Sequence, residues 1–472
     1  MKYDYHVVVL GAGSAGLVVA SGAVSLGAKV ALIEADKMGG DCLNAGCVPS
    51  KSFLKSAHFA GEITNAEELG LNASMDKVDL SKVMKRVKQV INDIAPHDSV
   101  ERYEKMGVKV FSGQASFIDK HTVQVGQTKL TAKHIVIATG SEPVVPPIKG
   151  LDTINYLTNR NIFDLKELPE HLIVLGGGPI GLELGQGFAQ LGAKVSVIDM
   201  NDHLFGKDDP EVAPILEKQL QQDGVELLMK SKILEVKKIK TGIEVIIEKD
   251  GKQSSVIGDQ VLVSLGRRPV SKNLGLEKVG IQTDKRGFVT TNAKLQSAIK
   301  HIYACGDVTG PYQFTHMAGY QAGIVIRNIV FRMGAKVDYS SVPWTTYTKP
   351  EVAHVGYTEP WAKSLGLYHD KVLVDLNEMD RAKADNDTNG FLKLILNKKS
   401  IIIGATFVGD KTGEMIPLAT LAIKQKLKAT AFLGMIFSYP TEAEIFKFAS
   451  LAKVREGFKP WQKNLIQKIL LR

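Results

Sequence analysis

The sequence predicts an α/β protein in which two doubly wound units precede a smaller α+β domain. Two segments, residues 6–34 and 171–199, align without gaps at an offset of 165 and are identical at 14 of 29 positions. Each runs from a short apolar stretch through G-x-G-x-x-G to a second apolar stretch, as a buried strand, a turn, a helix and a strand would. Alternating apolar residues near 371–376 and 391–408 predict the strands of the third domain, which opens near Pro343.

The repeated turns indicate two Rossmann-type dinucleotide-binding domains. The first glycine of such a turn permits a tight bend, the second lets backbone approach a pyrophosphate, and the third allows close helix–strand packing. The following helix N-terminus offers N–H groups to the phosphates. Glu34 and Asp199 each lie 23 residues after the first glycine, where a carboxylate can accept ribose hydroxyls. The turn glycines are Gly11, Gly13 and Gly16 in the first copy and Gly176, Gly178 and Gly181 in the second.

The composition is that of a globular protein of two to four domains, with 44% apolar residues over 472 positions. The net charge of +9 could favour an anionic partner, but a solvated surface bias explains it more simply, and we expect no nucleic-acid partner. Residues 5–28 carry no charge and mimic a membrane span. Their glycines predict a strand, a turn and a helix instead, and hence a cytoplasmic protein.

Cys42 and Cys47 lie five positions apart in a glycine-flanked segment that follows the first unit, and the chain has only one other cysteine, Cys305. A zinc site needs about four ligands, and no second pair or nearby histidine supplies them, so no metal site is expected. A purely structural disulfide suits small secreted domains. Two unrelated buried thiols remain as an alternative, but the neighbouring dinucleotide unit favours a redox-active disulfide.

Together these motifs resemble the flavin-dependent pyridine nucleotide–disulfide oxidoreductases, which include dihydrolipoamide dehydrogenase, glutathione reductase and mercuric reductase. The resemblance implies FAD bound by residues 1–148 and 270–338, NAD(P)H bound by 149–269, and a homodimer formed through a dimerisation domain at 339–472. It also implies cofactor-binding roles for Ser14, Ala15, Gly40, Lys51, Thr139, Gly140, Gly266, Arg267 and Asp307, the last toward the flavin ribityl chain.

The resemblance gives the cysteines separate roles. Cys47 would be the thiolate beside the flavin, and Cys42 the outer thiol that attacks the substrate. A helix N-terminus after Cys47 and the nearby Lys51 would depress a thiol pKa. We expect Lys51 to pair with Glu183, which occupies the place of Val18 in the first repeat; the alternative for Glu183 is an exposed helix residue. Cys305 is expected to be a small buried residue.

The nucleotide preference is predicted from Asp199. Its carboxylate would repel a 2′-phosphate, which usually calls for arginine, and the loop 200–209 carries Lys207 but no Arg. The sequence therefore favours NADH over NADPH.

One segment departs from the family pattern. Disulfide reductases of this family usually carry His-Pro-Thr with a glutamate five residues after the histidine, whereas this chain has Tyr439-Pro440-Thr441 and Glu444. Tyrosine titrates near pH 10, so Tyr439 is a poor general base at neutral pH. Mercuric reductases also have tyrosine here, but they carry a C-terminal cysteine pair that this chain lacks. An alternative for Tyr439 is an interface packing residue.

The predicted acceptor is therefore a small molecule or a metal ion of unknown identity. Two alternatives remain open at this point: a dihydrolipoamide dehydrogenase with an atypical acid–base residue, and a redox-sensing flavoprotein with little turnover.

The last twenty residues, 453–472, carry a net charge of +5 and place Trp461, Leu465 and Ile469 at four-residue spacing. This pattern predicts a basic amphipathic helix. Its expected role is either packing on its own dimer or weak peripheral contact with an anionic membrane.

Overall fold

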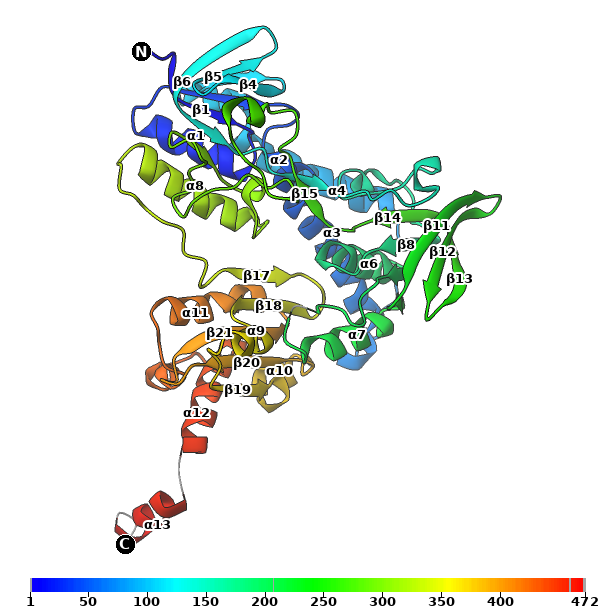
Figure 1. The fold of residues 1–472 in the computed structure, drawn as a ribbon. Helices are drawn as coiled ribbons and strands as arrows, with labels where there is room; N and C mark the ends of the chain where they lie inside the picture. Colours follow the sequence, from blue (N-terminus) through cyan, green and yellow to red (C-terminus); the bar gives the residue numbers. More distant parts are fainter. Residues whose placement is uncertain (1, 207, 458–459, 470–472) are drawn as a thin grey trace. The chain divides into compact units, whose positions relative to one another are not determined.

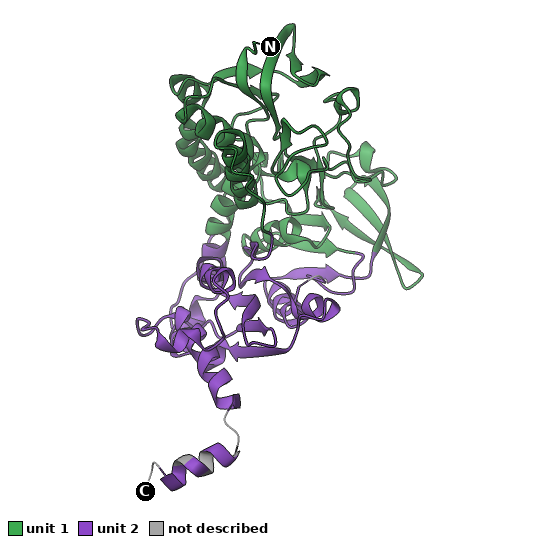
Figure 2. Cartoon of the chain, turned by 60° about the vertical axis from the view of Figure 1, so that its left-hand side comes forward, with its two compact units in different colours: residues 1–57, 77–199, 232–338 green, residues 58–76, 200–231, 339–472 purple. Residues whose placement is uncertain are grey.

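The structure is a computed structural model that describes residues 2–206, 208–457 and 460–469 (Figure 1). Lys207, and residues 458–459 and 470–472 of the predicted basic helix, lie outside the described residues. The chain divides into two compact units, one of residues 1–57, 77–199 and 232–338, the other of residues 58–76, 200–231 and 339–472 (Figure 2). The boundaries of the three expected domains stay a prediction.

The first sheet is parallel at its centre. Strand β1 (Tyr5–Leu10) lies between β2 (Val30–Glu34) and β6 (Thr128–Ile137) and runs parallel to both. Strand β3 (Lys109–Ser112) extends the sheet beyond β2, and β16 (Ile302–Ala304) returns to pair with β6. Because a central parallel strand is covered on both faces, its residues read as an unbroken apolar run, and residues 7–10 are fully buried.

The second copy of the repeat folds in the same way. Strand β8 (His171–Leu175) lies between β9 (Lys194–Ile198) and β14 (Gln260–Val263), again with parallel pairing. Helix α1 (Ser14–Ser25) follows the first glycine turn and α6 (Pro179–Gln190) the second. The strand–turn–helix prediction for both copies is therefore confirmed, including the uncharged stretch at residues 5–28. No helix within the described residues is long and apolar enough to cross a membrane.

One glycine of each repeat permits a close helix contact. A Cβ at Gly22 of α1 would lie 2.5 Å from Ile326 on α8 (Thr315–Ile329). At the aligned Gly187 of α6, a Cβ would lie 2.6 Å from Phe53 on α3 (Cys47–Thr64). Both distances are shorter than real Cβ contacts, so a larger residue at either position would require the contacted side chain to move.

The second unit contains a five-stranded antiparallel sheet in the order β17-β18-β21-β20-β19. The strands expected near 371–376 and 391–408 are present as β19 (Asp370–Asp375), β20 (Phe391–Leu396) and β21 (Ile402–Gly409). Strands β17 (Pro343–Thr346) and β18 (Glu351–Gly356) complete the sheet, and helices α11 (Thr412–Lys424) and α12 (Ile445–Gly457) contribute to its apolar core.

Further helices are α2 (Gly40–Asn44), α4 (Leu80–Ile94), α5 (Val100–Lys105), α7 (Val212–Gln222), α9 (Glu359–Ser364), α10 (Asp380–Ala384) and α13 (Pro460–Ile469). Further strands are β4 (Ala115–Asp119), β5 (Thr122–Val125), β7 (Ser141–Pro143), β10 (Val225–Leu228), β11 (Lys232–Ile239), β12 (Gly242–Lys249), β13 (Lys252–Gly258) and β15 (Arg267–Pro269).

A buried ionic cluster anchors the 200–231 segment in the second unit. The side chain of Lys393 on β20 is fully buried, and its ammonium nitrogen lies 3.0 Å from Asp209, 2.7 Å from Glu211 and 2.7 Å from Glu359. Thr406 also donates a hydrogen bond of 2.5 Å to Asp209. Because a buried charge is costly without partners, loss of one member of this cluster would destabilise the packing of the segment on the sheet.

Replacing Lys393 should destabilise the second unit far more than replacing an exposed lysine of the same network. Lys393→Ala leaves the fully buried Asp209 carboxylate without its ammonium partner, and we expect a loss of about 3–5 kcal/mol in denaturant unfolding at fixed protein concentration. The control is Lys363→Ala: Lys363 pairs with Glu359 at 2.6 Å but is 55% exposed, so its removal should cost less than about 1 kcal/mol. Equal losses would contradict the cluster's role.

Candidate active site

The two cysteines are held by consecutive short elements of the first unit. Cys42 lies on α2, and Cys47 is the first residue of α3. Both are free thiols, with Cys42 partly buried and Cys47 exposed, and a hydrogen bond joins them. The Thr315 hydroxyl lies 3.2 Å from the Cys47 sulfur. The two sulfurs are therefore close enough to interact directly.

The surroundings make the two thiols unequal. The pKa of Cys47 is lowered to about 6, chiefly by the hydrogen bond from Cys42 and also by Thr315 and the positive charge of Lys51, against the opposing effects of burial and Glu183. The same hydrogen bond, followed by burial, raises the pKa of Cys42. The N-terminus of an 18-residue helix also favours an anion at Cys47. At neutral pH, Cys47 is therefore the thiolate and Cys42 the proton donor.

Lys51 and Glu183 form the expected ion pair, with 2.8 Å between Nζ and Oε2. The Glu183 side chain is only 7% exposed, so the alternative of an exposed helix residue is wrong. The same α3–α6 contact contains the side chains of Phe53 and Phe188, whose rings are tilted by 38° with their centroids 4.8 Å apart. Helix α3, which begins at Cys47, thus packs against α6, the helix that follows the second glycine turn.

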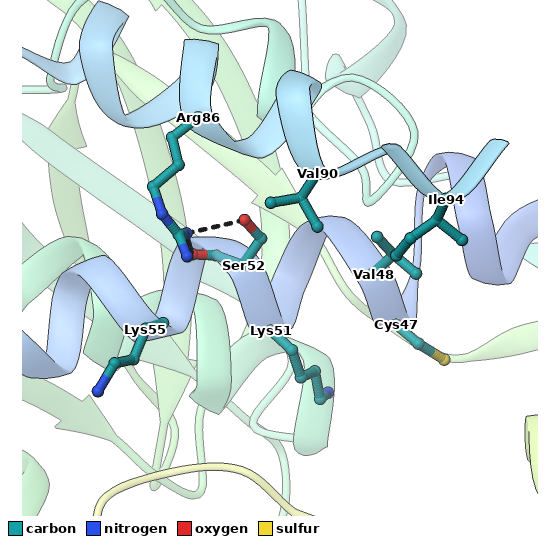
Figure 3. Close-up of a pocket in the computed structure, with 8 residues that line it drawn as sticks. All are labelled: Cys47, Val48, Lys51, Ser52, Lys55, Arg86, Val90 and Ile94. Carbon is teal, nitrogen blue, oxygen red and sulfur yellow. Dashed lines mark hydrogen bonds between the residues drawn. The ribbon is translucent and has the colours of Figure 1, made fainter. Parts of the chain in front are cut away.

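A pocket of about 330 Å³ opens beside Cys47 between α3 and α4 (Figure 3). Arg86 crosses from α4 and donates hydrogen bonds to the Ser52 carbonyl at 2.7 Å and to the Ser52 hydroxyl at 2.9 Å. Three of the lining side chains are cationic, which adds positive potential near the thiolate. The pocket is lined by Cys47, Val48, Lys51, Ser52, Lys55, Arg86, Val90 and Ile94.

The first glycine turn has the form that a dinucleotide pyrophosphate requires. Gly11 has a φ of 102°, and a Cβ there would lie 2.4 Å from the Ala138 carbonyl oxygen. Gly13 precedes α1 without any side-chain cap, so the first N–H groups of the helix are not capped by a side chain. A Cβ on Gly40 would lie 2.8 Å from Gly13, so the two glycines form a cradle that side chains would fill. These features fit FAD.

The second turn repeats this geometry. Gly176 has a φ of 106°, and Gly178 precedes α6 without a side-chain cap. The terminal acids also match, because Glu34 accepts a hydrogen bond of 2.6 Å from the Ala12 N–H and Asp199 accepts one of 2.6 Å from the Gly177 N–H. Each carboxylate is thereby held against its own turn.

A chain of polar contacts links the cysteine segment to Asp307. Ser141 donates a hydrogen bond of 2.6 Å to Asp307, whose carboxyl pKa is raised by burial. Arg267 donates to the Ser141 hydroxyl at 2.8 Å and pairs with Asp41 at 2.6 Å. The guanidinium of Arg267 is thus engaged by protein groups, and it links β15 to the residue next to Cys42. Its cofactor role stays a prediction.

Several other predicted residues have protein contacts of their own. Ser14 hydrogen-bonds to the Cys42 sulfur. The Thr139 hydroxyl donates to the Val270 carbonyl at 2.5 Å, and Gly140 has a φ of 72°. Cys305 is fully buried, which confirms the expectation of a packing residue, and burial raises the pKa of its thiol to about 12. A Cβ on Gly266 would meet open space.

Tyr439 and Glu444 lie in the second unit and bind different partners. The Tyr439 side chain is exposed, and its hydroxyl donates to Asp380 at 3.1 Å. This hydrogen bond raises the pKa of Tyr439 above its ordinary value, so even less of the basic tyrosinate form is present at neutral pH. Glu444 is buried and instead accepts a hydrogen bond of 3.3 Å from the Thr441 N–H. The encounter of Tyr439 with Cys42 across a dimer stays a prediction.

Three residues of the site were missed from the sequence. Asp41 is adjacent to Cys42, and that adjacency was the only signal for its pairing with Arg267. Thr315 and Ser141 are distant from the cysteines in the chain, and no local pattern marks them.

Two dinucleotide turns and an interacting thiol pair define a nucleotide-dependent thiol–disulfide oxidoreductase. The family model described as "Pyridine nucleotide-disulphide oxidoreductase" matches residues 5–322, and the model of the family's dimerisation domain matches residues 342–450. The chain therefore belongs to the pyridine nucleotide-disulphide oxidoreductase family, as the sequence predicted.

Relatives cover nearly the whole chain. A mercuric reductase of Staphylococcus aureus is 36% identical over 449 residues, which are 95% of this chain and 82% of that protein. A dihydrolipoyl dehydrogenase of Geobacillus stearothermophilus is 34% identical over 450 residues, 94% of each chain.

Two solved structures share the fold. LpdA from Mycobacterium tuberculosis has a TM-score of 0.86 at 27% identity and covers 95% of this chain and 99% of its own. The HOCl-induced flavoprotein disulfide reductase RclA from Escherichia coli has a TM-score of 0.83 at 28% identity. The match covers 94% of this chain and 99% of the RclA chain. The chain is a flavin-dependent disulfide oxidoreductase that uses FAD and a pyridine nucleotide, and its dimerisation domain supports a homodimer.

The pKa of Cys47 should respond in opposite directions to the two halves of the ion pair. Lys51→Met removes a positive charge that stabilises the thiolate, so the pKa should rise by about one unit. Glu183→Gln removes an opposing negative charge, so the pKa should fall. The measurement is the pH dependence of iodoacetamide alkylation of the reduced protein, with Cys42→Ser as background. Shifts of the same sign in both variants would contradict this electrostatic account.

Proposed function

We propose that this chain moves electrons from NADH through FAD to the Cys42–Cys47 disulfide and on to a thiophilic metal ion. The observation that carries this proposal is the thiol pair itself, in which Cys47 is a stabilised thiolate and Cys42 holds a proton. Soft metal ions prefer thiolate ligands.

Reduction of an organic disulfide requires proton transfer at the outer thiol by an acid–base group, whereas metal binding does not. When the outer thiol attacks a disulfide, its proton must be removed and the departing thiolate must be protonated. Tyr439 replaces the family's histidine, and its hydrogen bond to Asp380 raises its pKa further. A metal ion displaces the Cys42 proton directly and needs no such shuttle. The tyrosine therefore supports a metal acceptor over lipoamide or glutathione disulfide.

Each turnover transfers two electrons. A hydride from NADH and one proton from solvent reduce the Cys42–Cys47 disulfide to two thiols, and reoxidation of the pair passes two electrons to the acceptor and releases two protons. One Hg²⁺ ion would be reduced to Hg⁰, or two Cu²⁺ ions to Cu⁺. The chemistry that FAD supplies when bound is acceptance of the hydride and delivery of its electron pair to the disulfide.

The relatives support a metal acceptor without deciding which ion it is. Mercuric reductases are among the relatives that match over nearly the whole chain. RclA has also been solved as a Cu(II) complex. This chain has no cysteine beyond Cys305, so capture of the ion would rely on Cys42 and Cys47 alone.

We also propose NADH as the donor. The Asp199 carboxylate is held against the second turn by the Gly177 N–H, where it would accept ribose hydroxyls and repel a 2′-phosphate.

The acceptor should be identified by comparing wild type with Cys42→Ser in steady-state NADH oxidation. The panel is Hg²⁺, Cu²⁺, lipoamide, glutathione disulfide and a quinone. We expect reduction of a metal ion to fall at least about 100-fold in Cys42→Ser, because a single thiolate can neither chelate the ion nor form the disulfide. Quinone reduction should persist as the control, since it needs flavin alone. Lipoamide as the only cysteine-dependent acceptor would instead indicate a dihydrolipoamide dehydrogenase, and the absence of any such acceptor a redox sensor.

Variants at Tyr439 separate the acid–base argument from packing. Tyr439→His restores a group that titrates near neutral pH, so lipoamide turnover should rise by about 10-fold or more while metal-ion reduction stays unchanged. Tyr439→Phe is the control and should leave both rates, and the rate of flavin reduction by NADH in stopped flow, close to wild type. Efficient lipoamide reduction by the wild type would contradict the proposed role.

Donor preference should depend on Asp199. Asp199→Ser removes the carboxylate, so KM for NADH should rise about 10-fold and KM for NADPH should fall, because the repulsion of the 2′-phosphate disappears. Glu34→Gln, in the first turn, serves as the control and should leave the NADH/NADPH ratio unchanged. An unchanged ratio in Asp199→Ser would rule out this role.

A further inference from the structure

Helix α13 presents an apolar face that the described part of the chain does not cover. Trp461, Leu465 and Ile469 are 60%, 47% and 64% exposed. Residues four apart lie on the same side of a helix, so these three form one row. The row lies beyond residue 450, where the match to the dimerisation-domain model ends.

We propose that α13 is a docking surface for anionic lipid membranes. The apolar row is short and contains a tryptophan, a side chain that favours the boundary between lipid and water. A row of three side chains suits shallow insertion at a membrane surface rather than a span.

The residues around the row carry positive charge and no negative charge in the sequence. No acidic residue follows Glu456, whereas residues 457–472 contain four basic ones. Among the described side chains, Lys468 in the last turn of α13 and Arg455 at the end of α12 are exposed. Lys453 pairs with Asp370 and Glu456, so its charge is compensated within the second unit. The exposed Lys468 beside the apolar row, together with the basic excess of residues 457–472 in the sequence, matches a surface of anionic headgroups.

A homodimer would bind a membrane more tightly than a single subunit. One short helix binds a membrane weakly. A dimer carries two copies of α13, and once the first is bound the second binds at a high effective concentration. Reversible attachment of the dimer therefore needs no further contact.

The test uses the FAD-loaded full chain and sedimentation with vesicles. One set contains phosphatidylcholine with phosphatidylglycerol, and the other phosphatidylcholine alone. The variant is the double substitution Leu465→Glu and Ile469→Glu. The matched control is Leu365→Glu, because Leu365 is 53% exposed and lies at the end of α9.

We expect wild type and Leu365→Glu to sediment with the anionic vesicles, and the bound fraction to fall at least about 10-fold in the double variant or at high salt. All three proteins should retain NADH-dependent quinone reduction and the dimer mass in light scattering. Equal sedimentation of wild type with both vesicle sets, or none, would overturn the proposal. Dissociation of the double variant into monomers would also overturn it, since α13 would then belong to the dimer interface.

Discussion

The ion pair between Lys51 and Glu183 is the interaction on which the site depends. It joins the helix that begins at Cys47 to the helix that begins at the second dinucleotide turn, and Phe53 and Phe188 pack in the same contact. Removing Lys51 would leave the buried Glu183 carboxylate without this partner, so the pair favours one arrangement of the two helices. Lys51 also supplies positive charge to the Cys47 thiolate. The lysine that positions the helix of Cys47 thus also contributes to the reactivity of its thiol.

The internal repeat shows how this interaction could arise on a duplicated scaffold. In the first copy, the position equivalent to Glu183 is Val18, which is 40% exposed, whereas Glu183 is buried. The glycine four residues later is used in both copies for helix contact, with α8 at Gly22 and with α3 at Gly187. The same framework therefore supports a solvent-facing position in one copy and a buried charged position in the other.

The sequence was sufficient for features that depend on local pattern. Both glycine turns, their acids and the strands of three sheets follow from short-range spacing, and the pairing of Lys51 with Glu183 followed from the family resemblance. Contacts that depend on tertiary folding could not be predicted. The Thr315 hydroxyl reaches Cys47 from 268 residues away, Arg267 turns to Asp41 and Ser141, and the Tyr439 hydroxyl finds Asp380. Each of these partners is far in sequence from the group it binds.

The central claim is that the two cysteines form a redox centre in series with the flavin, and anaerobic reductive titration tests it most directly. The FAD-loaded wild type should consume twice as many reducing equivalents of dithionite per subunit as the Cys42→Ser variant. In the wild type both the disulfide and the flavin must be reduced, whereas the variant has only the flavin. Bleaching of the flavin should also lag behind the first half of the titration. Equal consumption by the two proteins would contradict the account, since the cysteines would then hold no electrons.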